Sequence, residues 1–280
     1  MGRGPDFIGL GAQRSGTSWI YACLYDHPQI CAPTKEIHFF SRDVNWRRGR
    51  DWYERHFRAC GPGTVSGEFS SSYLPSAPAA ERIAALYPRA KLVVSLRHPL
   101  ERLISNYLND IVAGAIPAGT PLIEAVGGRA EYVEQGRYAA HLTRYLAHVP
   151  RSQLLVLLYE DALDDPAGFI GRIYAFLGVD AAYRPGMLAA RVGVGRVPRS
   201  VRLERALTRG TWVLRGPLTR GLWWAAKRAG VGQTLRRANT INVPRPVLPP
   251  AERRRLADMF SDDISALERL LGRDLSAWRQ

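Results

Sequence analysis

The sequence contains few cysteines and no long uninterrupted apolar run. Its three cysteines, Cys23, Cys31 and Cys60, form no C-x-x-C pair, and an odd number does not indicate a disulfide framework. We therefore expect reduced thiols in a cytoplasmic protein. No run of about 18 apolar residues is present, which argues against a transmembrane helix. The first predicted strand begins at Phe7, so we also expect no signal peptide.

Acidic residues are in short supply relative to basic ones. The 280 residues include 39 Lys or Arg and 25 Asp or Glu, which gives a formal net charge of +14. Such a charge attracts polyanions, whether nucleotide, acidic glycan, nucleic acid or anionic lipid, and does not choose among them. With 46% hydrophobic residues, the chain can bury a sizeable core, and we predict one domain over 1–280.

The apolar runs that are present are short and alternate with helical patterns. Helical spacing of apolar residues follows Pro99 and Pro166 and returns from Leu256 to Leu271. This alternation predicts an α/β fold, a P-loop-like, mostly parallel sheet with helices on both faces and a ligand crevice at the carboxyl ends of its strands. The predicted strands are Phe7–Leu10, Gln29–Ala32, Thr64–Glu68, Leu92–Leu96 and Leu154–Leu158.

A glycine loop lies between the first predicted strand and a helix. The segment Phe7–Trp19 reads as a buried strand, a loop and a first helical turn, whose free N–H groups favour anions. Gly11 and Gly16 keep the spacing of a nucleotide triphosphatase loop, but Thr17 occupies the position of its lysine. Arg14 is the cation of the loop instead. The pattern predicts a site for phosphate or sulfate and argues against ordinary Mg-nucleotide hydrolysis.

Two further segments place charged side chains just beyond predicted strands. Arg97 follows the fourth strand, and Ser105 lies two turns into the next helix, so both could bind a second phosphate. A surface salt bridge is the alternative for Arg97. Lys35, Glu36 and His38 follow the second strand, where Glu36 could act as a general base or remain an ordinary solvated carboxylate.

Together these segments resemble the sulfotransferases that use 3′-phosphoadenosine 5′-phosphosulfate, especially the heparan sulfate O- and N-sulfotransferases and their bacterial relatives. The resemblance rests on GAQRSGTS at 11–18, EIHFF at 36–40 and LRHPLERLISNY at 96–107. It covers nearly the whole chain and is poorest over 200–240. It implies that Arg14 touches the transferring sulfate. The implied donor-binding residues are Gln13, Arg14, Ser15, Gly16, Thr17, Ser18, Arg97, Ser105 and Arg196.

The same resemblance implies the catalytic and acceptor-side residues. Glu36 is the implied base and His38 its polar neighbour, although imidazole titrates nearest neutrality and His38 is the rival base. Lys35 and Glu68 are assigned to the acceptor side. The segment GEFSSSY at 67–73 is similar to G-E-x-[ST]-P-x-Y, with Ser72 in place of proline. Around Arg196, GRVP is similar to a glycine–arginine loop that closes on the donor, but its preceding lysine is absent.

The segment 196–237 is unusually basic. It contains eleven Arg or Lys and a single acid, Glu204, interspersed with Trp212, Trp223 and Trp224. One interpretation is a pair of helices packed on the core. Another is that 200–240 forms a lid or an insertion facing the acceptor or the membrane, with residues 203–237 in peripheral contact with anionic headgroups. The sequence contains no helix-turn-helix, zinc or RNP signature, so we expect no specific nucleic-acid partner.

The resemblance thus implies an enzyme that transfers a sulfuryl group from 3′-phosphoadenosine 5′-phosphosulfate to a hydroxyl, in preference to an amine. The implied acceptor is a carbohydrate, a glycolipid or another small molecule, the co-product is adenosine 3′,5′-bisphosphate, and no metal is required. The alternatives are a P-loop nucleotide kinase and a non-catalytic nucleotide-binding protein. We expect a cytoplasmic protein, peripheral at the inner membrane surface, and no pattern indicates an oligomeric state.

Overall fold

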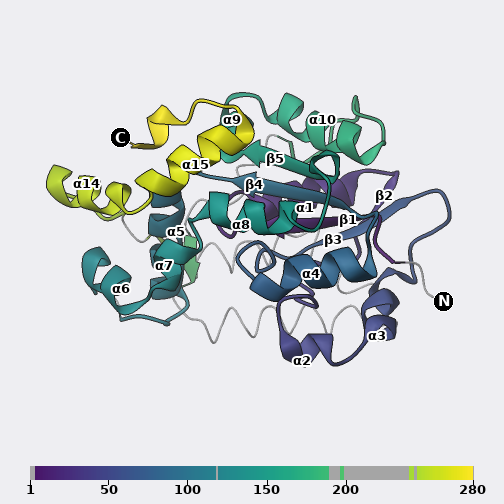
Figure 1. Cartoon of the computed structure of the whole chain (residues 1–280), viewed down its shortest axis with the longest axis horizontal. Helices are drawn as coiled ribbons and strands as arrows, with labels where there is room; N and C mark the ends of the chain where they lie inside the picture. Colours follow the sequence, from purple (N-terminus) through teal and green to yellow (C-terminus); the bar gives the residue numbers. More distant parts are fainter. Residues whose placement is uncertain (1–3, 118, 189–195, 199–239, 243–244, 280) are drawn as a thin grey trace. The chain divides into compact units, whose positions relative to one another are not determined.

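The fold is described from a computed structural model, in which residues 4–117, 119–188, 196–198, 240–242 and 245–279 are described (Figure 1). Within these ranges, five parallel strands form one sheet in the order β2-β3-β1-β4-β5. All five lie where the sequence predicts strands. The strands are β1 (Phe7–Gly11), β2 (Ile30–Cys31), β3 (Val65–Phe69), β4 (Lys91–Leu96) and β5 (Leu154–Leu158).

Helices follow the strands and cover both faces of the sheet. The longer helices are α1 (Thr17–Asp26), α4 (Ala77–Leu86), α5 (Pro99–Val112), α8 (Tyr138–Leu146), α10 (Pro166–Leu177), α14 (Pro250–Asp258) and α15 (Ser261–Leu271). The shorter ones are α2 (Asp43–Trp46), α3 (Arg50–Glu54), η1 (Arg55–Phe57), α6 (Leu122–Gly128), α7 (Glu131–Glu134), η2 (Arg151–Gln153), α9 (Tyr159–Asp164) and η3 (Ser276–Arg279).

The core lies between the sheet and these helices. Apolar side chains of α1 and α10, among them Trp19 and Ile173, form a buried cluster with Phe7 and Val93 of the sheet. Figure 1 places α4 and α8 over the other face of the sheet. All five residues of β1 are buried, because a central parallel strand is covered on both faces. The predicted α/β architecture is therefore confirmed.

Local sequence signals explain where α10 begins and ends. The Asp165 carboxylate accepts a hydrogen bond of 2.8 Å from the amide of Gly168, and Gly178 closes the helix at φ 83°. The C-terminal pattern is less simple. The helical spacing predicted from Leu256 to Leu271 is divided between two helices, α14 and α15, at Phe260, whose side chain is buried.

The chain divides into two compact units. The first contains residues 1–103, 128–193 and 248–280 and includes the five-stranded sheet. The second contains 104–127 and 194–247, where the described residues include an antiparallel pair formed by β6 (Arg196–Pro198) and β7 (Thr240–Asn242). The predictions for the basic segment fall almost entirely on 199–239, outside the described residues. A single domain over 1–280 stays a prediction.

A disulfide bond joins Cys31, at the end of β2, to Cys60, which follows η1. Cys23 on α1 is a free, buried thiol. The expectation of reduced thiols was therefore wrong for Cys31 and Cys60, because folding brings together residues that are 29 positions apart. The cytoplasmic location loses this support and stays a prediction. Among the described helices, none is both long and apolar enough to cross a membrane.

Candidate active site

The glycine loop lies at the carboxyl end of β1, between β3 and β4. It lies at a topological switch point of the sheet, because the chain leaves β1 toward β2 on one side and leaves the neighbouring strand β4 toward β5 on the other. Gly16 begins α1 in the left-handed conformation at φ 78°, and a Cβ atom there would come 2.7 Å from the ring of Tyr159. The amide of Ala12 donates to the carbonyl of Ser95 over 2.8 Å, which ties the loop to β4. The loop is thus a preformed anion cradle at a helix start.

Its individual residues differ in exposure. Ser15 is fully buried, and its carbonyl accepts a 2.8 Å hydrogen bond from the hydroxyl of Ser95. Thr17 is buried and Ser18 is exposed, while Gln13 and Arg14 are partly exposed. The side chains that face solvent around the cradle therefore include a hydroxyl and a guanidinium.

Arg97 lies beside this loop, and its Nη2 lies 3.8 Å from a carboxylate oxygen of Glu101, as the salt-bridge alternative predicts. A phosphate-binding role for Arg97 stays a prediction. The Nη1 of Arg97 donates to the carbonyl of Arg14 over 3.2 Å, and its guanidinium lies 5.2 Å from the ring centroid of Tyr159. The Tyr138 hydroxyl holds the carbonyl of Arg97 over 2.9 Å. Ser105 lies on the part of α5 that belongs to the second unit, and Arg196 lies in β6 of that unit. Their participation stays a prediction.

The Glu36 carboxylate is held by backbone and side chain together. It accepts hydrogen bonds from the amide of Ser71, over 3.0 Å, and from its hydroxyl, over 2.9 Å. Lys35 Nζ and His38 Nε2 lie 3.5 Å and 3.6 Å from its oxygens. Since the side chain is 30% exposed, the carboxylate is fixed in orientation yet reachable by a ligand.

Lys35 connects this carboxylate with the glycine loop. Its Nζ donates to the hydroxyl of Ser18, in the first turn of α1, over 2.9 Å. The sequence predicts both segments separately, but it does not predict this contact, because Ser18 and Lys35 are 17 residues apart. The structure thus brings the anion cradle and the candidate base to a common site.

His38 lies on the other side of Glu36. Its Nδ1 pairs with the hydroxyl of Ser72 over 2.7 Å, and Ser72 pairs in turn with Ser41 over 2.7 Å. Burial, followed by the positive charge of Arg42, lowers the pKa of His38. The imidazole is therefore favoured in its neutral form near neutral pH, which suits a polar neighbour of Glu36 as well as a proton acceptor.

The backbone is strained at the candidate catalytic residues. Among the described residues, positive φ angles outside glycine occur at Arg14 (68°), Glu36 (59°) and His38 (55°). Side chains with a Cβ atom rarely adopt this conformation, which costs roughly 1–3 kcal/mol per residue and occurs preferentially at functional sites. This observation, independent of any motif, points to the same three residues.

Glu68 does not lie on the acceptor side, where the family resemblance assigns it. It lies on β3 with no exposed surface, and its carboxylate accepts hydrogen bonds from the hydroxyls of Ser70, Tyr73 and Tyr53. Burial raises the pKa of Glu68 to about 7. Direct contact with an acceptor does not fit this arrangement, because the carboxylate is enclosed by the protein.

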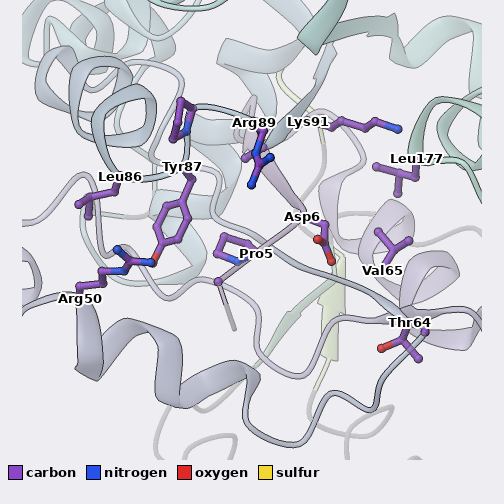
Figure 2. Close-up of a pocket in the computed structure, with 14 residues that line it drawn as sticks. Pro5, Asp6, Arg50, Thr64, Val65, Leu86, Tyr87, Arg89, Lys91 and Leu177 are labelled. Atoms are coloured by element: carbon purple, nitrogen blue, oxygen red, sulfur yellow. The ribbon is translucent and has the colours of Figure 1, made fainter. Parts of the chain in front are cut away.

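A separate cavity of about 700 Å³ opens at the other edge of the sheet (Figure 2). Asp6, Val65 and Lys91, at the amino ends of β1, β3 and β4, line it together with Tyr87 and Arg89. It is therefore distinct from the glycine-loop site. Within the described part of the chain, no group of three or more His, Cys, Asp or Glu is placed to hold a metal ion.

Comparisons with known proteins agree with these features. The family model of the sulfotransferase domain matches residues 4–189. Human heparan sulfate glucosamine 3-O-sulfotransferase 6 is 32% identical over 186 residues, which cover 63% of this chain and 53% of that protein. The human bifunctional heparan sulfate N-deacetylase/N-sulfotransferase 3 is 31% identical over 199 residues, covering 62% of this chain and 22% of the relative. The chain therefore spans about half, or less, of the length of these curated relatives.

Solved structures extend the likeness. A sulfotransferase from Alicyclobacillus acidocaldarius superposes with a TM-score of 0.73 at 26% identity, covering 99% of this chain and 100% of that one. The sulfotransferase domain from the curacin biosynthetic pathway shares the fold at 16% identity, with a TM-score of 0.51 over 66% of this chain and 77% of that one.

Proposed function

The chain belongs to the sulfotransferase domain family, and we propose that it transfers the sulfuryl group of 3′-phosphoadenosine 5′-phosphosulfate to a hydroxyl group. The observation that carries the proposal is the contact between Lys35 and Ser18, which joins the anion cradle to the segment of Glu36. A sulfuryl donor and a base must lie on either side of the transferred group, and this contact supports that arrangement.

The donor is proposed from the two basic positions next to the cradle. Arg14 lies in the loop, and Arg97 contacts the carbonyl of Arg14. We assign the loop amides and Arg14 to the 5′-phosphosulfate, and Arg97 with Ser105 to the 3′-phosphate. The loop offers hydrogen bonds and the positive end of α1 to an anion, and a guanidinium suits a phosphate better than a neutral group does.

The proposed chemistry follows from the groups present. Sulfuryl transfer moves an anionic group between two oxygens in line, so positioning and charge stabilisation supply most of the rate enhancement. Glu36 takes the proton of the acceptor hydroxyl, and Lys35 stabilises negative charge between donor and acceptor. The Ser71 amide and hydroxyl hold the carboxylate in place, and His38 contacts it from the other side.

A carbohydrate is the proposed class of acceptor, with glycolipids and other small molecules as further candidates. The named activities of the heparan sulfate relatives support this choice, and the chain's net charge of +14 is compatible with an anionic glycan without favouring it over other anions.

The test is transfer of radiolabelled sulfate from the proposed donor to a panel of glycans, glycolipids, sterols and phenols, with Glu36→Gln as the inactive control. We expect label to appear in at least one acceptor with wild-type protein and to be strongly reduced with the variant. Phosphoryl transfer from Mg-ATP without sulfuryl transfer would identify a kinase. Tight binding of adenosine 3′,5′-bisphosphate without transfer to any acceptor would favour a non-catalytic binding protein.

A further inference from the structure

The Glu68 carboxylate lies at the centre of a buried hydrogen-bond network. It accepts from the hydroxyl of Ser70 over 2.6 Å, from that of Tyr73 over 2.5 Å and from that of Tyr53 over 3.2 Å. Glu68 has no exposed surface. A carboxylate in such a place is costly to bury unless its hydrogen bonds are made, and here three hydroxyls supply them.

Two of these hydroxyls also hold the backbone of the candidate catalytic segment. The amide of His38 donates to Ser70 Oγ over 3.0 Å, and the amide of Phe39 donates to Tyr73 Oη over 2.9 Å. A hydroxyl group has one proton to give. Since Ser70 and Tyr73 each give that proton to Glu68, their lone pairs are left to accept from the two successive amides.

The segment held in this way is the strained one. Glu36 and His38 both have positive φ angles, 59° and 55°, which the surrounding structure must enforce. The amide of Glu36 is fixed separately, by a 2.9 Å hydrogen bond to the carbonyl of Phe69. The two hydroxyls therefore supply two of the anchors that follow Glu36 in the chain, beside the Asn45 side chain, which donates to the carbonyl of Ile37 over 3.0 Å.

We propose that Glu68 is a positioning residue for the Glu36–His38 segment, which it orients through the hydroxyls of Ser70 and Tyr73. Its ionised carboxylate fixes the direction of both hydrogen-bond chains. The predicted effect of Glu68 on the transfer rate rests on the proposed function, whereas its predicted effect on the conformation of the Glu36–His38 backbone does not. Glu68 touches neither donor nor acceptor in this account.

The proposal predicts a pH dependence. Burial raises the pKa of Glu68 to about 7. The charge of the Glu36 carboxylate also raises this pKa, whereas the hydrogen bonds from Ser70, Tyr73 and Tyr53 lower it. Tyr21 of α1 also interacts with the Glu68 charge. As pH falls below about 7, Glu68 gains a proton and becomes a donor, so one hydroxyl must reverse. Turnover should therefore decline on the acid side of neutrality.

The test compares Glu68→Gln with Glu54→Gln. Glutamine keeps the shape of Glu68 but replaces one accepting oxygen by an NH₂ group, which cannot accept from a hydroxyl. Glu54 is a matched control, because it is a buried carboxylate of α3 that accepts from the hydroxyl of Tyr87 over 3.2 Å and does not hold the His38 segment. Hydrogen exchange of the His38 and Phe39 amides, the donor KM and the pH profile of kcat are measured for each.

Since glutamine keeps one accepting oxygen, we expect exchange in Glu68→Gln to accelerate about tenfold at the amide whose hydroxyl partner loses its acceptor, the equivalent of one lost hydrogen bond. We expect kcat to fall about 10- to 100-fold through misplacement of Glu36, with the donor KM unchanged and the acid decline near pH 7 removed. Unchanged exchange and kcat in Glu68→Gln would overturn the proposal, as would the same changes in Glu54→Gln.

Ser70→Ala provides a second test if Glu68→Gln does not fold. It removes the acceptor of the His38 amide and leaves Glu68 in place, so exchange should accelerate at His38 more than at Phe39. Equal protection at His38 in wild type and variant would overturn the proposal. The exchange measurements need no turnover, so a wild-type protein without transferase activity would contradict the proposed function and still decide the role of Glu68.

Discussion

The surroundings of Glu36 favour it over His38 as the base of the proposed reaction. Its carboxylate is fixed by the Ser71 amide and hydroxyl and remains 30% exposed. His38 lies 3.6 Å away and is the rival base. A carboxylate held in one orientation and open to a ligand fits proton removal from a hydroxyl better than the more enclosed imidazole does.

Glu36→Gln should reduce the rate of transfer about 10²- to 10⁴-fold, the usual contribution of a positioned base, because glutamine cannot take a proton. Affinity for adenosine 3′,5′-bisphosphate should stay within about twofold, since we assign the donor to other residues. Single-turnover measurements with saturating donor separate the two effects. A larger loss in His38→Gln than in Glu36→Gln would transfer the role of base to His38.

Some site residues could be predicted from the sequence, and others could not. Arg14 and Arg97 could be selected because they follow predicted strands at the carboxyl ends where ligands bind, whereas Glu36 was selected as the base through the resemblance to the sulfotransferases. Glu68 could not be placed correctly, because one position in a strand does not reveal that hydroxyls from three other positions will enclose it. The link from Lys35 to Ser18 is likewise a product of the fold.

Among the elements, β1, the glycine loop and α1 together form the proposed donor site. The backbone geometry requires a glycine at position 16. Gly16 has φ of 78°, and a Cβ atom there would lie 2.7 Å from the Tyr159 ring. The five strands were predictable, since buried parallel strands are short continuous apolar runs. The division between α14 and α15 was not, because both helices keep the same apolar spacing across Phe260.

Gly16→Ala should weaken binding of adenosine 3′,5′-bisphosphate at least about tenfold and destabilise the fold by about 1–3 kcal/mol, because the loop must move away from Tyr159. Gly49→Ala is the matched control. Gly49 begins α3 at φ 79°, but nothing lies within 4 Å of its added Cβ atom. We expect the control to lose stability while keeping its affinity. Titration calorimetry and chemical unfolding provide both values, and equal affinities for Gly16→Ala and wild type would contradict the assignment of the loop.

The Cys31–Cys60 disulfide also links secondary-structure elements, since it joins the end of β2 to the chain after η1. Reduction should lower the free energy of unfolding by about 2–4 kcal/mol through the gain in entropy of the unfolded chain. Thermal unfolding with and without reductant measures the effect. The double variant Cys31→Ser with Cys60→Ser should match the reduced protein and be indifferent to reductant; a wild-type melting temperature that ignores reductant would argue against the bond.

For the molecule as a whole, the sequence predicted the family, because its motifs retain their order along the chain, while the position of the donor site stays a prediction. It did not predict the division into two compact units, and the residues that interrupt the family resemblance, 200–240, lie almost entirely outside the described residues. The identity of the acceptor stays a prediction, since acceptor loops vary most on a shared scaffold.

The central claim is that cations at Arg14 and Arg97 bind the two phosphate-bearing ends of one adenosine donor. The most direct measurement compares the dissociation constants of adenosine 3′,5′-bisphosphate and adenosine 5′-phosphate at fixed salt, in wild type and in Arg97→Ala. We predict about 10- to 100-fold tighter binding of the bisphosphate by wild type, the worth of a charge-assisted contact, and loss of most of that preference in the variant. Equal affinity of the wild-type protein for the two nucleotides would contradict the account.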